Sequence, residues 1–81
     1  MITYKKQKAC KILNKNIYIT DQADNRGCQY YATNDTADGK WNMGFLFKEN
    51  GKINYVHQTM FHTLSECKFE IEKYMKEWGV K

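Results

Sequence analysis

Histidine and cysteine side chains are the residues of this sequence that could bind a metal or act as nucleophiles. His57, His62 and Cys67 follow one another at intervals of five residues. Two further cysteines, Cys10 and Cys28, could join them in space. Structural zinc sites usually contain closely paired ligands, and here the two histidines have no close cysteine pair beside them. This spacing leads us to expect no metal and no cofactor. A catalytic thiolate needs an accessible, electropositive setting, which these cysteine positions do not offer, so we also expect no enzymatic activity.

Polar loops rich in Asp and Asn could in principle bind calcium. Asp38 and Gly39 occupy the fifth and sixth positions of a stretch that begins at Asn34, as in a helix–loop–helix calcium site. The bidentate Glu that such a site needs at its twelfth position falls on Phe45. The loop therefore has the composition of an ordinary turn, in which Asp and Asn bond their own backbone.

Length and composition limit the class of protein. The 81 residues accommodate one domain, residues 1–81, and a hydrophobic share of 42% is typical of a globular chain. No stretch approaches the roughly 18 apolar residues of a membrane span. Three cysteines cannot all pair, which favours reduced thiols in a cytoplasm. Abundant Lys, Asn, Ile and Tyr indicate an A/T-rich genome, such as that of a low-GC bacterium, or of a phage or mobile element inside one.

Positive charge is concentrated at the start of the sequence. Residues 1–20 contain five lysines and no acid, whereas residues 21–81 contain eight basic and nine acidic side chains. The cluster consists of Lys5, Lys6, Lys8, Lys11 and Lys15. It could face nucleic acid or an acidic protein, or it could protect an edge strand against aggregation. Lysine outnumbers arginine twelve to one, which argues against sequence-specific DNA recognition, because arginine makes the bidentate contacts to guanine.

Residues 8–20 alternate in a way that predicts a first β-hairpin. We expect a two-residue turn at Asn14-Lys15, which pairs Ile12 with Ile17. One face of this hairpin then carries Lys11, Leu13 and Tyr18, and the other carries Cys10, Ile12, Ile17 and Ile19.

A second hairpin is the clearest element of the sequence, and a short strand at residues 28–33 precedes it. Residues 41–48 and 52–60 flank Asn50-Gly51, the strongest short-range hairpin signal, because both central residues tolerate positive φ. This turn pairs Trp41 with Met60 and Met43 with Gln58, and it assigns to the core Trp41, Met43, Phe45, Val56 and Met60.

Residues 64–78 predict a helix. Thr63 and Glu66 fit a capping box, and Gly79 fits the position that ends the helix. The apolar stripe at helical spacing consists of Leu64, Cys67, Ile71, Met75 and Trp78. The expected fold is α+β: a four- to five-stranded antiparallel β-meander with one C-terminal α-helix packed on one face.

One helix can cover only one side of such a sheet. The other side is expected to carry an aromatic and aliphatic patch rimmed by Lys11 and Lys48, to which Tyr30 or Tyr31 also contributes. The patch consists of Leu13, Tyr18, Leu46, Ile53 and Tyr55. Phe69 should be exposed on the far side of the helix. We expect these side chains to bind a partner; burial of the patch in a homodimer, or within a curled sheet, remains an alternative.

Two resemblances bear on function. The segment 40–47 is similar to the aromatic strand of cold-shock and RNA-recognition domains, where rings on a sheet stack with bases, although its Gly and Phe spacing departs from both. In size and composition the chain also resembles the short phage and mobile-element proteins that block host machinery, anti-CRISPR proteins among them. This implies a non-enzymatic inhibitor that occludes a bacterial defence or nucleic-acid enzyme in the cytoplasm of the host. The alternative is a small single-stranded nucleic-acid-binding protein that uses the N-terminal lysines and the sheet aromatics.

Overall fold

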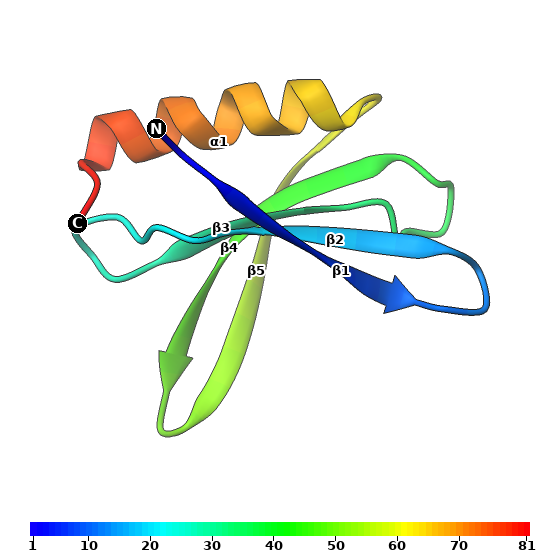
Figure 1. Ribbon diagram of the computed structural model, residues 1–81, viewed down its shortest axis with the longest axis horizontal. Helices are drawn as coiled ribbons and strands as arrows, with labels where there is room; N and C mark the ends of the chain where they lie inside the picture. The colour runs from blue at the N-terminus through cyan, green and yellow to red at the C-terminus, as the bar shows by residue number, and fades with distance from the viewer.

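The computed structural model describes residues 1–81 and shows a five-stranded antiparallel sheet with one helix (Figure 1). The elements are β1 (Tyr4–Cys10), β2 (Lys15–Thr20), β3 (Gln29–Thr33), β4 (Trp41–Glu49), β5 (Lys52–Phe61) and α1 (Leu64–Trp78). The strands lie side by side in chain order, so the sheet is a meander with β1 and β5 at its edges. The predicted fold class is confirmed.

The β4–β5 hairpin forms around the predicted turn. Asn50 and Gly51 have φ values of 53° and 78°, and Phe45 faces Val56 as expected. A bulge further along β5 then shifts the register, so that Met43 faces Thr59 and Trp41 faces Phe61. The expected partners Gln58 and Met60 were therefore wrong, because the extra residue of the bulge opposes no residue of β4. Met60 consequently points away from the core and is 42% exposed.

The first hairpin differs from the prediction at its turn. The loop spans Lys11 to Asn14, and Cys10 pairs with Lys15, so the two-residue turn at Asn14-Lys15 was wrong. Ile12 lies at the tip of this loop and is 94% exposed. Asn14 has a φ of 53°, and its tolerance of this backbone conformation allows the longer loop to close.

Helix α1 begins and ends where the sequence predicts. The Thr63 hydroxyl accepts a hydrogen bond from the Glu66 backbone N–H, and the Glu66 carboxylate accepts one from Thr63. Gly79, with a φ of 82°, ends the helix. The helix lies across one face of the sheet, against β3, β4 and β5 (Figure 1).

The core lies between the helix and the centre of the sheet. It consists of Tyr30, Ala32, Met43, Cys67, Ile71 and Met75. Trp41, Phe45 and Leu64 pack partly buried around it. Val56 and Trp78, two residues predicted for the core, are 36% and 48% exposed. The reason at Val56 is geometric: the β4–β5 hairpin extends beyond the region that the helix covers (Figure 1).

A buried ionic network joins the β2–β3 loop to the end of the helix. Asp24 is fully buried and accepts five hydrogen bonds, three from Arg26, one from the Cys28 N–H and one from the Tyr30 hydroxyl. Burial alone would raise the pKa of Asp24, but these hydrogen bonds outweigh it and hold the pKa below its usual range. Asp24 also forms an isolated bridge with Val80, which ties the loop to the residues after the helix.

Candidate functional site

The side of the sheet that the helix leaves uncovered is the main candidate site. The strand registers place a row of outward-facing side chains across it, from Lys5 on β1 through Ile19 and Tyr31 to Gly44 and His57. Neighbouring rows add aliphatic and aromatic side chains. We call this surface the concave face and define it by Gln7, Ile17, Ile19, Tyr31, Leu46, Ile53 and Tyr55.

Two hollows show that this face is curved. The larger one, of about 540 Å³, and the smaller one, of about 250 Å³, are both lined by Gln7 of β1 and Tyr55 of β5. These residues come from opposite edges of the sheet, which in a flat sheet would lie about 19 Å apart. They can line the same hollows only because the two edges curl toward each other. Gln7 and Tyr55 therefore stand between two depressions in one trough.

A contact between two tyrosines forms the middle of the trough. The ring of Tyr55 meets the ring of Tyr31 edge-on, with 5.5 Å between centroids. Tyr31 is 6% exposed and Tyr55 is 54% exposed, so Tyr55 covers Tyr31 and presents its own ring to solvent. Burial, together with Tyr55, raises the pKa of the Tyr31 phenol, which therefore stays neutral.

Gly44 makes room for this arrangement. It is the cross-strand partner of Tyr31, and a Cβ atom there would lie 2.9 Å from the Tyr31 hydroxyl oxygen. The same Cβ would overlap the carbonyl oxygen of Val56. Any residue other than glycine would therefore displace the ring that supports Tyr55.

Polar side chains line the borders of both hollows. Lys5, Asp21 and Gln29 lie around the smaller one, and Thr33 and Asp35 around the larger one. An apolar and aromatic centre with a polar rim of mixed charge is the composition of a protein–protein interface. This arrangement is suited to binding another protein surface, because it offers contact area and hydrogen-bonding groups.

The structure brings part of the predicted partner-binding set together. Leu46, Ile53 and Tyr55 share the concave face, and Lys48 pairs with Ile53 at its border. Tyr18 lies on the opposite side, because it pairs with Ala32 of the core row. The predicted place of Tyr18 was wrong because the register of β2 against β3 puts it on the helix side, and that of Leu13 was wrong because Leu13 lies in the β1–β2 loop.

Lys11 lies in the β1–β2 loop together with Leu13, away from the hollows. The other N-terminal lysines divide between the two sides of the sheet. Lys5 lines the smaller hollow of the concave face, whereas Lys6 pairs with Tyr18 on the other side. Lys8 pairs with Asn16 and also contributes to the lining of the larger hollow at the sheet edge. Lys15, at the start of β2, pairs with Cys10. The cluster is thus a single feature in sequence but not in space.

Sequence reasoning missed Gln7, Ile17 and Ile19 as members of the concave face. The alternation of β2 already placed Ile17 and Ile19 on one side and Tyr18 on the other. Which of these sides faces the helix depends on the register of β2 against β3, in which Tyr18 pairs with Ala32 and Ile19 with Tyr31, and no short-range turn signal fixes that register. Gln7 is polar, so the hydrophobic pattern offered no reason to include it in this face.

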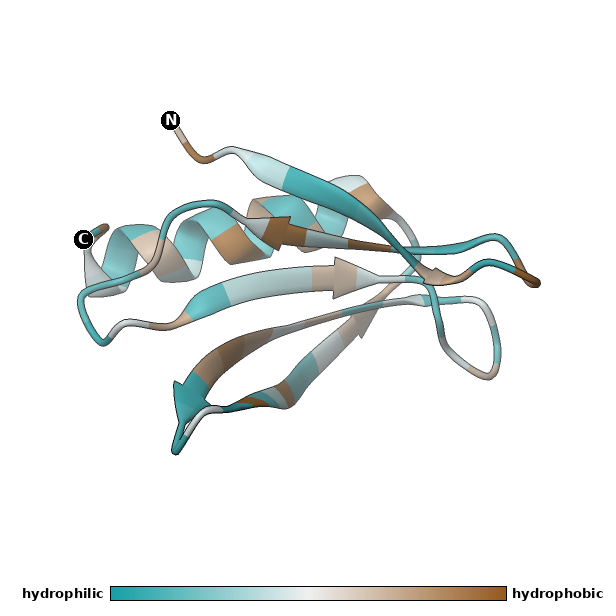
Figure 2. Ribbon diagram, turned by 60° about the horizontal axis from the view of Figure 1, so that its bottom comes forward, coloured by the Kyte–Doolittle hydropathy of each residue, from teal (hydrophilic) through white to brown (hydrophobic).

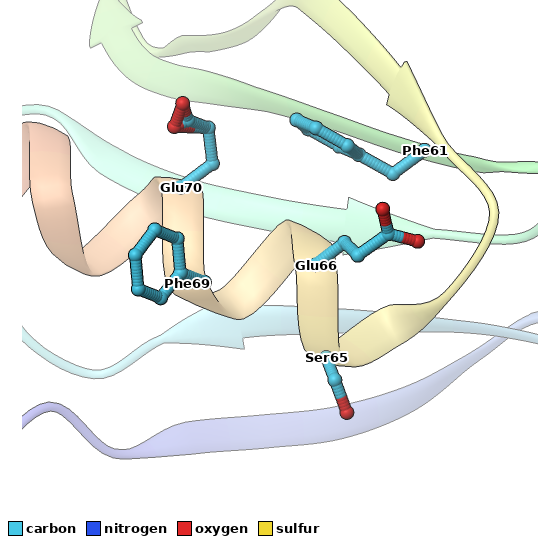
Figure 3. Close-up of a pocket in the computed structure, with 5 residues that line it drawn as sticks. All are labelled: Phe61, Ser65, Glu66, Phe69 and Glu70. Atoms are coloured by element: carbon cyan, nitrogen blue, oxygen red, sulfur yellow. The ribbon is translucent and has the colours of Figure 1, made fainter.

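Phe69 is exposed as predicted, but it lies on the helix, separate from the concave face. Its side chain is 74% exposed between two shallow hollows on the helix surface. Figure 3 shows the hollow shared with Phe61 of β5: Glu66 and Glu70 extend from the helix on the side where Phe61 lies, and Ser65 points to the opposite side. The structure thus separates Phe69 from the other predicted contact residues.

The histidines and cysteines do not assemble. No three His, Cys, Asp or Glu side chains come close enough to hold a metal ion. Cys28 and Cys67 are buried, and all three cysteines are free. No helix has the length and apolar character needed to cross a bilayer. Comparisons of this chain with protein families, with curated proteins and with solved structures find no match.

Proposed function

We propose that this is a non-enzymatic binding protein whose working surface is the concave face. The observation that carries the proposal is the trough in which residues of both sheet edges, Gln7 and Tyr55, line the same two hollows. Tyr55 and Ile53 are both half-exposed there and offer large contact area. Tyrosine loses little conformational entropy on binding, and its hydroxyl tolerates residual water.

The shape of the face favours a different protein over a second copy of this chain. Two identical concave surfaces leave a gap when they meet, whereas a convex loop or helix of another protein can fill the trough. The mixed rim of Lys5, Lys48 and Asp21 would surround that contact. In keeping with the A/T-rich composition, we propose a partner in the cytoplasm of a bacterial host, such as a defence or nucleic-acid enzyme that the bound protein occludes.

The test compares two surfaces of the same protein. Wild type, the Ile53→Asp/Tyr55→Asp double variant and Phe69→Asp are immobilised and exposed to lysate of a low-GC bacterium, and captured proteins are identified by mass spectrometry. Binding to the purified partner is then measured for each variant. We expect wild type and Phe69→Asp to bind equally, and the double variant, while it remains folded at the assay temperature, to lose binding at least tenfold.

Each other outcome contradicts the proposal in a different way. Loss of binding by Phe69→Asp alone would place the contact on the helix. Dimeric wild type that becomes monomeric in the double variant, measured by light scattering, would show self-association. Failure of the wild type to bind any protein would contradict a protein partner altogether.

A further inference from the structure

The face of the sheet that carries the helix has a part that the helix leaves open. The helix packs against β3, β4 and β5, so the same side of β1 and β2 remains beside it rather than beneath it. Aromatic rings and lysines collect there. We call this surface the aromatic–lysine strip; it consists of Tyr4, Lys6, Lys8, Tyr18, Trp41 and Lys68. Lys8 belongs to it because it follows Lys6 by two residues in β1 and so lies on the same side; its Nζ atom donates to the Asn14 side chain.

The strand registers explain why these residues meet. Lys6, Tyr18, Ala32 and Met43 form one cross-strand row, and Ala32 and Met43 belong to the core beneath the helix. Because Ala32 is small, the ring of Tyr18 can reach across β3 toward Trp41, with 6.0 Å between the two ring centroids. Both rings are only partly buried.

Lysine ammonium groups lie next to these rings. Lys68 of the helix has its Nζ atom 4.8 Å from the Tyr4 ring centroid and 5.2 Å from that of Tyr18. The Nζ atom of Lys6 also lies near Tyr18, 5.9 Å from its ring centroid. Each cation is held by the negative face of a ring and remains available to an anion.

The strip has an excess of positive charge. The ion pairs of the structure are Arg26–Asp24 and Lys73–Glu70, so none of the three strip lysines is paired with a carboxylate. Figure 2 shows that the middle of β1 is hydrophilic. At one end of the strip, Glu72 accepts a hydrogen bond from the Tyr4 hydroxyl at 3.2 Å.

We infer that the aromatic–lysine strip binds single-stranded nucleic acid, independently of the concave face. Lys6, Lys8 and Lys68 contact phosphates, and unpaired bases stack on Tyr18 and Trp41. A duplex would present its phosphates but keep its bases out of reach of the rings. An acidic peptide would match the charge but would leave the rings without a stacking partner.

Recognition should not depend on sequence. Arginine makes the commonest specific contact to guanine, and the single arginine of the chain, Arg26, is engaged with Asp24 in the β2–β3 loop, away from the strip. Lysine contributes point charges, and the aromatic rings can stack with any base. Affinity should therefore fall as the salt concentration rises and should be nearly independent of the nucleotide sequence.

Fluorescence anisotropy with a labelled 12-nucleotide oligothymidine tests the inference. Three phosphate contacts on a single strand predict a slope of about −2 in log affinity against log salt, and a loss of roughly 20-fold between 50 and 200 mM salt. The Lys6→Gln/Lys8→Gln variant should reduce that slope to about −0.7. The matched control, Lys48→Gln/Lys52→Gln on the β4–β5 hairpin, removes the same charge elsewhere and should keep the wild-type slope.

Trp41 reports whether bases stack on the strip. Trp78→Phe leaves Trp41 as the single tryptophan, and its fluorescence should be quenched as oligothymidine binds but not by polyglutamate. The inference is overturned by absence of binding at 50 mM salt, by equal loss of affinity in the two lysine variants, or by unchanged Trp41 fluorescence at saturation. Equal affinity for a duplex of the same length would also overturn it, because the rings would then contribute nothing.

Discussion

The guanidinium group of Arg26 lies over the ring of Trp78, with 3.9 Å between its central carbon and the ring centroid. The same group donates to the buried carboxylate of Asp24 at 2.9 Å. One side chain thus connects the β2–β3 loop to the last turn of the helix. This explains why Trp78, which lies on the apolar stripe of the helix, is half-exposed rather than inserted into the core.

Removing the charge of Asp24 should destabilise the fold. Asp24→Asn keeps the shape of the side chain, but one oxygen is replaced by an NH2 group that faces donors, and Arg26 loses its ionic partner. We expect the free energy of unfolding in urea to fall by about 2–3 kcal/mol, since hydrogen bonds to charged groups contribute about 1.5–3 kcal/mol. Glu77→Gln, an exposed position on the helix, is the control and should change stability by less than about 0.5 kcal/mol. Equal effects at the two positions would show that the network is not structural.

Low pH should lower the free energy of unfolding through protonation of Asp24. The pKa of Asp24 is lower in the folded protein than its ordinary value of 3.8, so the folded state favours the ionised form. This contribution is fully present above the unfolded pKa and is lost as pH falls through the folded pKa. Urea unfolding at pH values from 7 to 2 should therefore show stability falling below about pH 4, with a smaller decrease in Asp24→Asn. Parallel curves for the two proteins would assign the acid sensitivity to other groups.

Gly44→Ala should disrupt the centre of the concave face. The added Cβ would overlap the Val56 carbonyl and crowd the Tyr31 hydroxyl, so β5 and the Tyr31 ring must both shift. Overpacking of this kind costs about 1–3 kcal/mol, and we expect the upper end of that range in thermal or urea unfolding. Thr59→Ala, at an exposed position on the same hairpin, provides the comparison. If Gly44→Ala were as stable as Thr59→Ala, the close approach of Tyr31 to Gly44 would be wrong.

Phe69→Ala should leave stability nearly unchanged. The side chain is 74% exposed, and alanine has the best helix propensity, so the free energy of unfolding should stay within about 0.5 kcal/mol of wild type. Ile71→Ala, two residues further along the helix and fully buried, should cost about 2–5 kcal/mol. A melting temperature for Phe69→Ala as low as that of Ile71→Ala would show that the helix is rotated from its assigned orientation.

The sequence predicted the elements whose signals are local. The Asn50-Gly51 turn and the Thr63–Glu66 capping box each fix the backbone within a few residues, and both occur as expected. The turn of the first hairpin was misplaced because its four-residue loop contains Ile12 and Leu13, which read as strand residues but lie exposed at the tip. A hairpin pattern without a strong turn dipeptide does not determine its own register.

The candidate site was predicted only in part because it depends on long-range geometry. Leu46, Ile53 and Tyr55 follow from the register of the β4–β5 hairpin, and all three lie on the concave face. The curvature that places Tyr55 beside Gln7 arises from all five strands together, and no short segment of sequence encodes it. The bulge in β5 likewise has no local signature, yet it decides which side Met60 faces.

The unequal burial of the three thiols has a practical consequence for labelling chemistry. Burial raises the pKa of Cys28 and raises that of Cys67 to about 11, so neither forms a thiolate readily at neutral pH. Only Cys10, at the end of β1, is partly accessible. Because maleimides react with thiolates, the native chain already carries a single attachment point for a dye, at the edge of the sheet and without any engineered cysteine.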